Sequence, residues 1–448
     1  MAREIELKLL LDEAGMRRLR ALPALKAHKP REIRLHAVYF DTPDHALARR
    51  GLALRLRREG RRWVQTVKSG SGVIAGLSTP LESEAPAPGG RLNLDAIADL
   101  ALRAAVREAA ADAPLGPVCE TAIRRSLRVM PGPAGGAIEL ALDVGEIRAG
   151  DRAEPFREAE LELKAGAPAE LFALAKTLFA DGPLRLSRLN KAARGYALAA
   201  GRPAVETPPP PVMAAPVLLS EGQTVESAAA AVLRNCLDQI AGNVAAAALA
   251  DTPEGPHQLR VGLRRLRAAA RVFGPVVGCP ALDALAAEAR ELAAVAGALR
   301  DLDVLAAEVA APVAAGEPAV AALLSALAQA RAPARAARLA RLAHPRTTAL
   351  VFDLGAFVEG RGWLRPADFA QTAALAEPVE ALAARALDAR WRKVARRAAR
   401  LDGLDVEARH DLRKKLKALR YAAEFFAALW PPRRSRAFLR QLRRSEEH

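Results

Sequence analysis

The sequence predicts two domains of different classes: an α+β domain built on an eight-stranded antiparallel β-barrel in residues 1–200, and an all-α helical bundle in residues 218–448. Short segments with period-2 or β-rich patterns recur through the first 200 residues. From about residue 218 onward, Ala, Leu and Arg dominate and apolar residues follow a helical period. Residues 201–217 contain a run of four prolines, which excludes helix and ladder hydrogen bonds and predicts a linker.

Eight strands are expected in the first domain. Their segments are residues 3–9, 33–41, 51–58, 62–68, 79–85, 118–129, 137–147 and 156–164. Helical patterns interrupt the strands at about 12–22, 93–112 and 168–180. Antiparallel strands in this number favour a closed barrel over a sandwich, although the sequence alone does not decide between the two.

The helical domain repeats itself. Residues 257–267 read HQLRVGLRRLR and residues 410–420 echo them as HDLRKKLKALR, so that His, Leu and basic residues recur in register. A later phenylalanine recurs as well (Phe273 and Phe426), and so does the valine that begins an upstream helix (Val225 and Val379). Such self-similarity predicts two helical hairpin or bundle units.

Charge and composition limit the class of protein. A formal charge of +16 and a pI near 10.5 predict anionic partners: polyphosphates, nucleotides, nucleic acids or an acidic membrane surface. Aromatic residues make up only 4%, which argues against single-stranded nucleic-acid binding by stacking. No apolar segment is long enough for a membrane span, and the first residues do not read as a signal peptide. The three cysteines fit no disulfide or metal spacing, so a reducing cytoplasm is expected.

Charged residues alternate with aliphatic ones in the expected strands. In the first strand, Glu4, Glu6 and Lys8 fall on one face and the aliphatic residues on the other. The same alternation recurs in later segments, at Arg55, Arg57, Lys68, Glu82, Glu84, Arg124 or Arg125, Glu139, Asp143, Glu158, Glu160, Glu162 and Lys164. A solvated strand face explains one such segment, but the recurrence predicts a barrel interior in which acids and bases face each other.

Such an interior has the chemistry to bind a triphosphate. Arginine pairs two phosphate oxygens through its planar fork, and lysine supplies a mobile charge. Carboxylates hold hard cations such as Mg²⁺ or Mn²⁺, which also bridge substrate phosphates. Hydrolysis then requires in-line water, charge neutralisation and a good leaving group.

An ordered set of motifs resembles the CYTH domain of the triphosphate tunnel metalloenzymes. The set comprises Glu-x-Glu-x-Lys at residues 4–8 and the segments 39–42, 54–57, 138–145, 158–164 and 191–196. The resemblance implies an eight-stranded tunnel with a metal-dependent active site. One departure is Pro80, two residues before Glu82, where the family often has Arg; this leaves the substrate preference open.

The resemblance also assigns roles within the tunnel. Glu4 and Glu6 would hold the catalytic metal, with Glu160 and Glu162 serving a second metal or the attacking water, and Lys8 completing the catalytic set. Metal ligands are expected among Glu4, Glu6, Glu139, Asp143, Glu160 and Glu162. Phosphate ligands are expected among Lys8, Arg55, Arg57, Lys68, Arg124, Arg125, Lys164 and Lys191, with the inward member of the Arg124–Arg125 pair left open.

Two basic stripes mark the helical repeats. On a helix, His257, Arg260, Arg264 and Arg267 lie within an arc of about 80°, with apolar residues on the other side. The second stripe consists of His410, Arg413, Lys417 and Arg420. A basic helix face is often only solvated, but two copies with the same His-x-x-Arg opening predict an anion-binding groove.

The helical half resembles a CHAD domain, on its two repeats and on the segment 299–303. The resemblance implies polyphosphate binding, with location on polyphosphate granules as a further expectation. The segment 299–303 has no counterpart at the end of the second repeat, which is therefore expected to be truncated.

Taken together, these patterns predict a metal-dependent inorganic triphosphatase of the cytoplasm that uses Mg²⁺ or Mn²⁺ and binds polyphosphate through its helical domain. Two alternatives stay open: a tunnel enzyme acting on thiamine triphosphate or cyclising ATP, and a non-catalytic polyphosphate-binding protein. A nucleic-acid binder is disfavoured by the low aromatic content.

Overall fold

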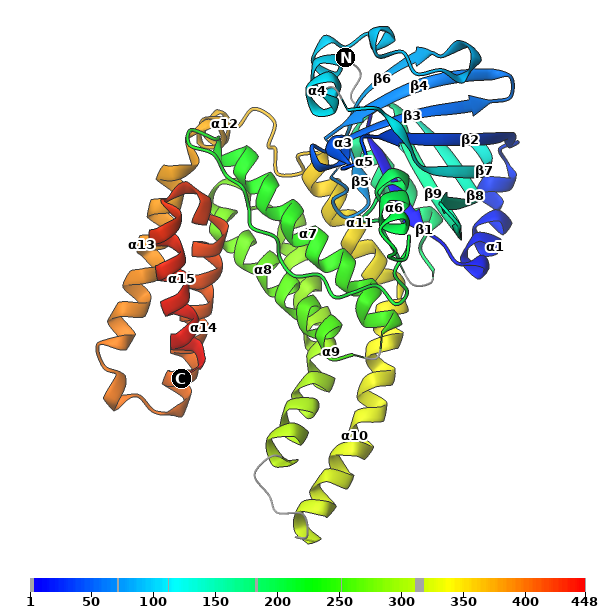
Figure 1. Cartoon of the computed structure of the whole chain (residues 1–448). Helices are drawn as coiled ribbons and strands as arrows, with labels where there is room; N and C mark the ends of the chain where they lie inside the picture. Colours follow the sequence, from blue (N-terminus) through cyan, green and yellow to red (C-terminus); the bar gives the residue numbers. More distant parts are fainter. Residues whose placement is uncertain are drawn as a thin grey trace. The chain divides into compact units, whose positions relative to one another are not determined.

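A computed structural model of the chain describes residues 4–70, 72–111, 113–181, 184–250, 252–310 and 318–447 (Figure 1). The ends of two expected elements, residues 3 and 112, lie outside this range. The chain divides into two compact units, one built mainly on the residues up to Pro210 and the other on most of the residues after it. Residues 201–216 form neither helix nor strand.

The first unit is built on one curled antiparallel sheet (Figure 1). Its strands are β1 (Glu6–Leu10), β2 (Arg31–Asp41), β3 (Leu52–Glu59), β4 (Arg62–Ser69), β5 (Leu77–Ser78), β6 (Leu81–Pro86), β7 (Gly116–Pro131), β8 (Ala137–Ala149) and β9 (Arg152–Ala165). Their order across the sheet is β5-β1-β9-β8-β7-β2-β3-β4-β6.

The eight strands expected from alternation are all present. The ninth, β5, has two residues, too few for any period to show in the sequence. The predicted antiparallel barrel is thus confirmed as a curled nine-stranded half-barrel. Within the described residues, no backbone pairing joins the end strands β5 and β6; instead, the Lys68 ammonium of β4 bridges Glu4, just before β1, to Glu82 of β6.

Short helices cover this sheet. They are α1 (Glu13–Ala21), α2 (Pro23–Lys26), α3 (Ala46–Arg49), α4 (Leu100–Ala110), α5 (Pro168–Leu178) and α6 (Lys191–Ala199), with 3₁₀ turns at Pro88–Gly90 and Leu94–Ala96. The predicted helix at 93–112 starts later, because Asp99 accepts a hydrogen bond from the Leu102 amide and caps α4 there.

Apolar packing on the outside of the sheet directs the charges inward. Leu52 and Leu54 of β3 and Val67 of β4 pack with Leu102 and Val106 of α4 in one buried cluster. Because successive side chains of a strand point to opposite faces, the β3 residues of the other phase, which include Arg55 and Arg57, point into the curl.

Helix α6 lies close against β7 and β8. Asn190 caps its first turn by accepting a hydrogen bond from the Ala193 amide, so Lys191 is the first helical residue. A Cβ atom added at Gly195 would lie 2.2 Å from Cys119 Sγ of β7, so only glycine permits this approach. The close contact holds α6, and with it the buried Lys191, against the sheet.

The helices that follow the linker are α7 (Val225–Leu249), α8 (Glu254–Val277), α9 (Pro280–Ala310), α10 (Pro318–Ala343), α11 (Pro345–Glu359), α12 (Phe369–Ala376), α13 (Val379–Ala398), α14 (Val406–Phe425) and α15 (Pro432–Glu447). Two 3₁₀ turns, Leu401–Gly403 and Ala427–Leu429, join the last of them. Across the described ranges, none of these helices has the length and apolar character needed to cross a membrane.

The two predicted repeats meet through equivalent positions. The Val225 amide donates to the Glu377 carbonyl at 2.8 Å, and the Val379 amide donates to the Gln223 carbonyl at 2.8 Å. The Phe273 and Phe426 rings, also equivalent, contact each other edge to face with centroids 5.8 Å apart. Reciprocal contacts of this kind are the mark of a two-fold relationship, here between repeats within one chain.

Candidate active site

A cavity of about 690 Å³ lies inside the curled sheet, and all nine strands and the start of α6 contribute to its wall. Among the described residues, eight basic and eight acidic side chains line it. The basic ones are Lys8, Arg31, Arg55, Arg57, Lys68, Arg125, Lys164 and Lys191, and the acidic ones are Glu4, Glu6, Glu59, Glu82, Glu84, Glu139, Glu160 and Glu162. The wall therefore has no net formal charge.

Glu160 of β9 is the centre of an ion-pair network on one side of the cavity. Its carboxylate oxygens lie 2.8 Å from Lys8 Nζ, 2.7 Å from Lys191 Nζ and 2.5 Å from an Arg125 nitrogen. Burial opposes its ionisation, but Lys191, Lys8 and Arg125 outweigh it and hold the pKa of Glu160 well below its usual value. Burial likewise favours neutral Lys8 and Lys191, but Glu160 raises the pKa of both lysines. All these side chains stay charged.

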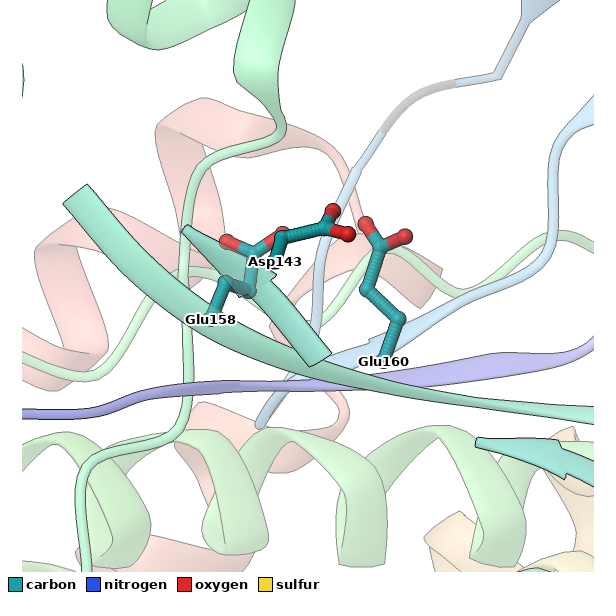
Figure 2. Close-up of side chains that lie close together, drawn as sticks. All are labelled: Asp143, Glu158 and Glu160. Atoms are coloured by element: carbon teal, nitrogen blue, oxygen red, sulfur yellow. The ribbon is translucent and has the colours of Figure 1, made fainter. Parts of the chain in front are cut away.

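Two further acids lie beside Glu160, and Figure 2 shows the three carboxylates pointing toward one another. Asp143, Glu158 and Glu160 are buried, with ligand atoms within 4.8 Å of one another, a geometry that could hold a metal ion. Lys191 contacts all three, however, at 3.0, 2.7 and 2.7 Å. Arg194 adds an ion pair to Glu158. We therefore assign this cluster to holding the basic side chains in place.

Asp143 illustrates that assignment. It is fully buried and is not among the residues that line the cavity. Both its oxygens accept hydrogen bonds from the Arg125 guanidinium, at 2.8 and 2.7 Å. Asp143 thus orients Arg125 toward the cavity, and because it also belongs to the acid group that could hold a metal ion, its role as a metal ligand stays a prediction.

A different set of glutamates is compensated by single lysines only. Glu4 pairs with Lys68 at 2.6 Å, Glu6 with Lys8 at 2.7 Å and Glu162 with Lys164 at 2.6 Å, and Glu139 lies 3.8 Å from Lys164. Glu6, Glu162 and Glu139 are direct cross-strand partners in β1, β9 and β8, and like charges directly opposite each other destabilise a sheet. Burial, reinforced by Glu82, raises the pKa of Glu4 despite Lys68. Burial, reinforced by Glu4 and Glu139 and opposed by Lys164, raises the pKa of Glu162. A hard divalent cation takes several carboxylate oxygens, so these residues form a suitable donor set.

The wall formed by β3, β4 and β6 presents guanidinium groups. Arg55 lies 3.7 Å from Glu82, and Arg57 lies 3.3 Å from Glu84 and 2.6 Å from Glu59. Burial, and next the neighbouring Arg55, lower the pKa of Arg57. In the part of the chain that the structure describes, the buried Nε atoms of both arginines have no hydrogen-bond partner. They are donors available to an anion in the cavity.

The structure separates the two adjacent arginines of β7. Arg125 lines the cavity, whereas Arg124 lines a different pocket on the outer face of the sheet. The assignment of Arg124 as a phosphate ligand in the tunnel is therefore corrected. Every other residue predicted to bind metal or phosphate in the tunnel, Asp143 apart, lines the cavity, and so does Pro80.

Sequence reasoning placed Glu158 among the alternating charges but gave it no role, and it missed the buried Arg194. Glu158 shares the phase of Glu160 and Glu162, so alternation could place it on the inner face but could not give its depth. Arg194 follows Lys191 by three residues, the spacing that puts two side chains on one side of a helix. That spacing could have indicated that Arg194 lies on the same side of the helix as Lys191.

The basic stripe of the first helical repeat lies on α8 as predicted. His257, Arg260, Arg264 and Arg267 are partly exposed, while the leucines of the same segment are buried. Arg260 pairs with Asp301 of α9 at 2.8 Å. Burial, and then three neighbouring arginines on α8 and α9, lower the pKa of Arg267. Such mutual repulsion marks a site of high positive potential.

The second stripe lies on α14. His410 and Arg413 are exposed, Lys417 and Arg420 are partly exposed, and Leu412 and Leu419 of the same helix are buried. Arg420 pairs with Glu424 at 2.8 Å, and its guanidinium lies over the Tyr421 ring, 4.5 Å from the ring centroid.

Comparison with known families agrees with this organisation. Residues 2–196 match the CYTH domain, and residues 231–448 match the CHAD domain. The chain carries a CYTH domain followed by a CHAD domain. The CYTH domain thus contains the charged cavity, and both basic stripes lie within the CHAD domain.

Individual relatives each match about half of this chain. The inorganic triphosphatase of Haemophilus influenzae is 30% identical over 200 residues, which are 44% of this chain and 55% of that protein. The chain thus matches about half the length of this curated relative. A solved CHAD domain from the plant Ricinus communis is 30% identical and covers 53% of this chain and 78% of its own, with a TM-score of 0.47. A Hippeastrum protein, described as an adenylyl cyclase candidate with dominant triphosphatase activity, is 20% identical; the match covers 44% of this chain and 96% of that one, with a TM-score of 0.32.

Proposed function

We propose that the CYTH domain hydrolyses inorganic triphosphate to pyrophosphate and phosphate with the help of a divalent cation. The observation that carries the proposal is the cavity wall, in which eight bases and eight acids of the described chain balance each other. Because this wall has no net charge, a highly charged anion would bind there more favourably together with cations that balance its charge. The inorganic triphosphatase relative supports the same substrate.

Glu4, Glu6, Glu139 and Glu162 would hold the cation, because these acids repel one another and the pKa values of Glu4 and Glu162 are raised. Mg²⁺ or Mn²⁺ bound there would polarise phosphate oxygens and neutralise charge on the leaving group.

The side chains of the network would bind and orient the phosphate chain. Lys8, Arg125 and Lys191 are held by buried acids on one wall, while Arg55 and Arg57 present donors from another. Groups fixed in advance lose little freedom when substrate binds, which favours in-line geometry. Glu162, which lines the same cavity, would serve a second cation or the attacking water.

The CHAD domain would bind polyphosphate through its two basic stripes. The support is the mutual repulsion of the arginines around Arg267 and the partial exposure of both stripes. Location in the cytoplasm, on polyphosphate granules, follows as part of the same proposal.

Phosphate release from inorganic triphosphate tests the hydrolase proposal. The full chain is assayed with Mg²⁺ or Mn²⁺, with EDTA, and as the double variant Glu4→Ala/Glu6→Ala. The matched control is Glu108→Ala/Glu120→Ala, which removes two acids outside the cavity. We expect cation-dependent release that the tunnel variant abolishes and the control retains.

Two results would replace this proposal. Faster turnover of thiamine triphosphate, or cyclisation of ATP, would change the substrate, which Pro80 in the cavity wall leaves open. No release with any cation, from a folded protein that binds polyphosphate, would make the chain a polyanion-binding protein without catalysis.

A further inference from the structure

A second cavity, of about 600 Å³, lies on the outer face of the sheet, between α1 and strands that include β7, β8 and β9. Among the described residues, five arginines line it: Arg17, Arg20, Arg124, Arg128 and Arg157. Only two acids accompany them, so the cavity has an excess of positive charge. The tunnel on the inner face has no such excess.

Three arginines lie in one row across the outer face. Arg34 of β2 pairs directly with Arg124 of β7, Arg124 pairs with Val144 of β8, and Val144 pairs with Arg157 of β9. Like charges directly opposite each other in neighbouring strands repel and destabilise the sheet. An anion bound between the guanidinium groups would attract both of them and offset this repulsion.

The local acids do not neutralise the arginines. Glu13 is shared between Arg17 at 3.2 Å and Arg157 at 3.5 Å. For Arg20, Arg34 and Arg124, the described part of the chain supplies no ion pair.

Arg128 is oriented by neutral groups instead. Its guanidinium donates to Ser126 Oγ at 2.9 Å and to the His28 carbonyl at 3.1 Å. Neither contact neutralises its charge. Burial and Arg20 lower the pKa of Arg128, and Glu32, the second acid of the cavity, opposes them, so among the described residues Glu32 is the one acid there that acts on this guanidinium.

We propose that this outer cavity binds a short inorganic phosphate chain of the size of pyrophosphate. Several guanidinium forks around one concave site match the oxygens of linked phosphates. The apolar lining consists of Met16 and Val144, and no aromatic side chain lines the cavity within the described residues. A nucleobase would therefore find no stacking surface, which favours a chain of phosphates alone.

The outer site is separate from the tunnel. Arg124 and Arg125 are consecutive residues of β7 and point to opposite faces of the sheet, as strand geometry requires. The proposal is thus independent of hydrolysis in the tunnel, and it holds whether or not the tunnel is an enzyme.

Arginine footprinting tests the proposal on the full chain. Phenylglyoxal modifies accessible guanidinium groups, and mass spectrometry reports each modified residue. Inorganic pyrophosphate is titrated in the presence of EDTA. Because each bound guanidinium is shielded by its phosphate oxygens, we expect modification of Arg20 and Arg124 to slow by about fivefold or more. Arg62, an exposed arginine on β4 outside both cavities, provides the internal control.

Variants assign the protection to the outer cavity. In Arg124→Ala, the pyrophosphate concentration that half-protects Arg20 should rise about tenfold, the loss expected for one charge-assisted contact. It should not change in Arg62→Ala or in Lys68→Met, which alters only the tunnel.

Three results would overturn the proposal. Equal protection of Arg62 would indicate general screening by the anion. Loss of the Arg20 protection in Lys68→Met would show that the protection depends on the tunnel. Stronger protection by a DNA oligonucleotide than by pyrophosphate would show that the cavity prefers a nucleic acid.

Discussion

Replacing Arg194 with Met tests whether buried ion pairs form the scaffold of the tunnel. Arg194 is 1% exposed and pairs with Glu158, which is 0% exposed and also lies 2.7 Å from Lys191. Removing one partner of a buried pair costs roughly 3–5 kcal/mol, because the other charge is left without compensation. Lys191 still offsets part of the Glu158 charge, so we expect a loss of about 2–4 kcal/mol of unfolding free energy.

The double variant Glu158→Gln/Arg194→Met removes both partners of the buried ion pair. It leaves no unpaired charge, so its loss should be clearly smaller than that of Arg194→Met alone. Hydrogen exchange of β8 and β9 peptides in increasing urea reports on the first unit only, which avoids mixing the two domains. Arg62→Met, at an exposed position, should stay within about 0.5 kcal/mol of the parent protein. A single variant as stable as the parent, or a double variant that loses as much as the single, would refute the scaffold.

Four further predictions concern charge, metal, substrate and the helical repeats. Glu162→Gln should stabilise the metal-free protein near neutral pH, since a raised pKa means that ionisation opposes folding; in thermal unfolding, the gain should vanish as the pH falls toward 4.5. Mg²⁺ at about 100 times its Kd should add about 2.7 kcal/mol of stability, and Glu4→Gln/Glu162→Gln should abolish this gain in melts with and without EDTA. Arg57→Lys should lower kcat/KM for triphosphate about tenfold through loss of the guanidinium fork, with exposed Arg58→Lys unchanged. Phe273→Ala should destabilise the helical unit by roughly 3–5 kcal/mol in urea melts, because it removes the ring contact with Phe426; Phe369→Ala, at an 83% exposed position, should not.

Alternation in the sequence was sufficient to predict most of the sheet and its inner face. Period 2 identifies which side chains share a face, and Glu4, Glu6 and Lys8 do line the cavity. It cannot identify a strand as short as β5. It also cannot choose between Arg124 and Arg125, because adjacent basic residues satisfy both phases.

The sequence could not show how deeply each acid is buried. The spacing of Glu158, Glu160 and Glu162 places all three on the inner face of the strand. In the folded chain, however, Glu158 is fully buried and Glu160 is bound by three basic side chains, whereas Glu162 pairs with Lys164 alone and its pKa is raised by burial. Those differences arise from where α6 places Lys191 and Arg194, a contact between segments distant in sequence.

The balanced wall of the tunnel also has a consequence for how substrate arrives. A cavity without net charge exerts little pull on an anion beyond a Debye length, about 8 Å at physiological ionic strength. The formal excess of +16 must therefore reside elsewhere on the chain, on groups such as the outer arginines and the helical stripes. These would raise the local concentration of phosphate chains by long-range attraction and would make association sensitive to salt. Turnover inside the tunnel, at close range among paired charges, would depend on salt far less.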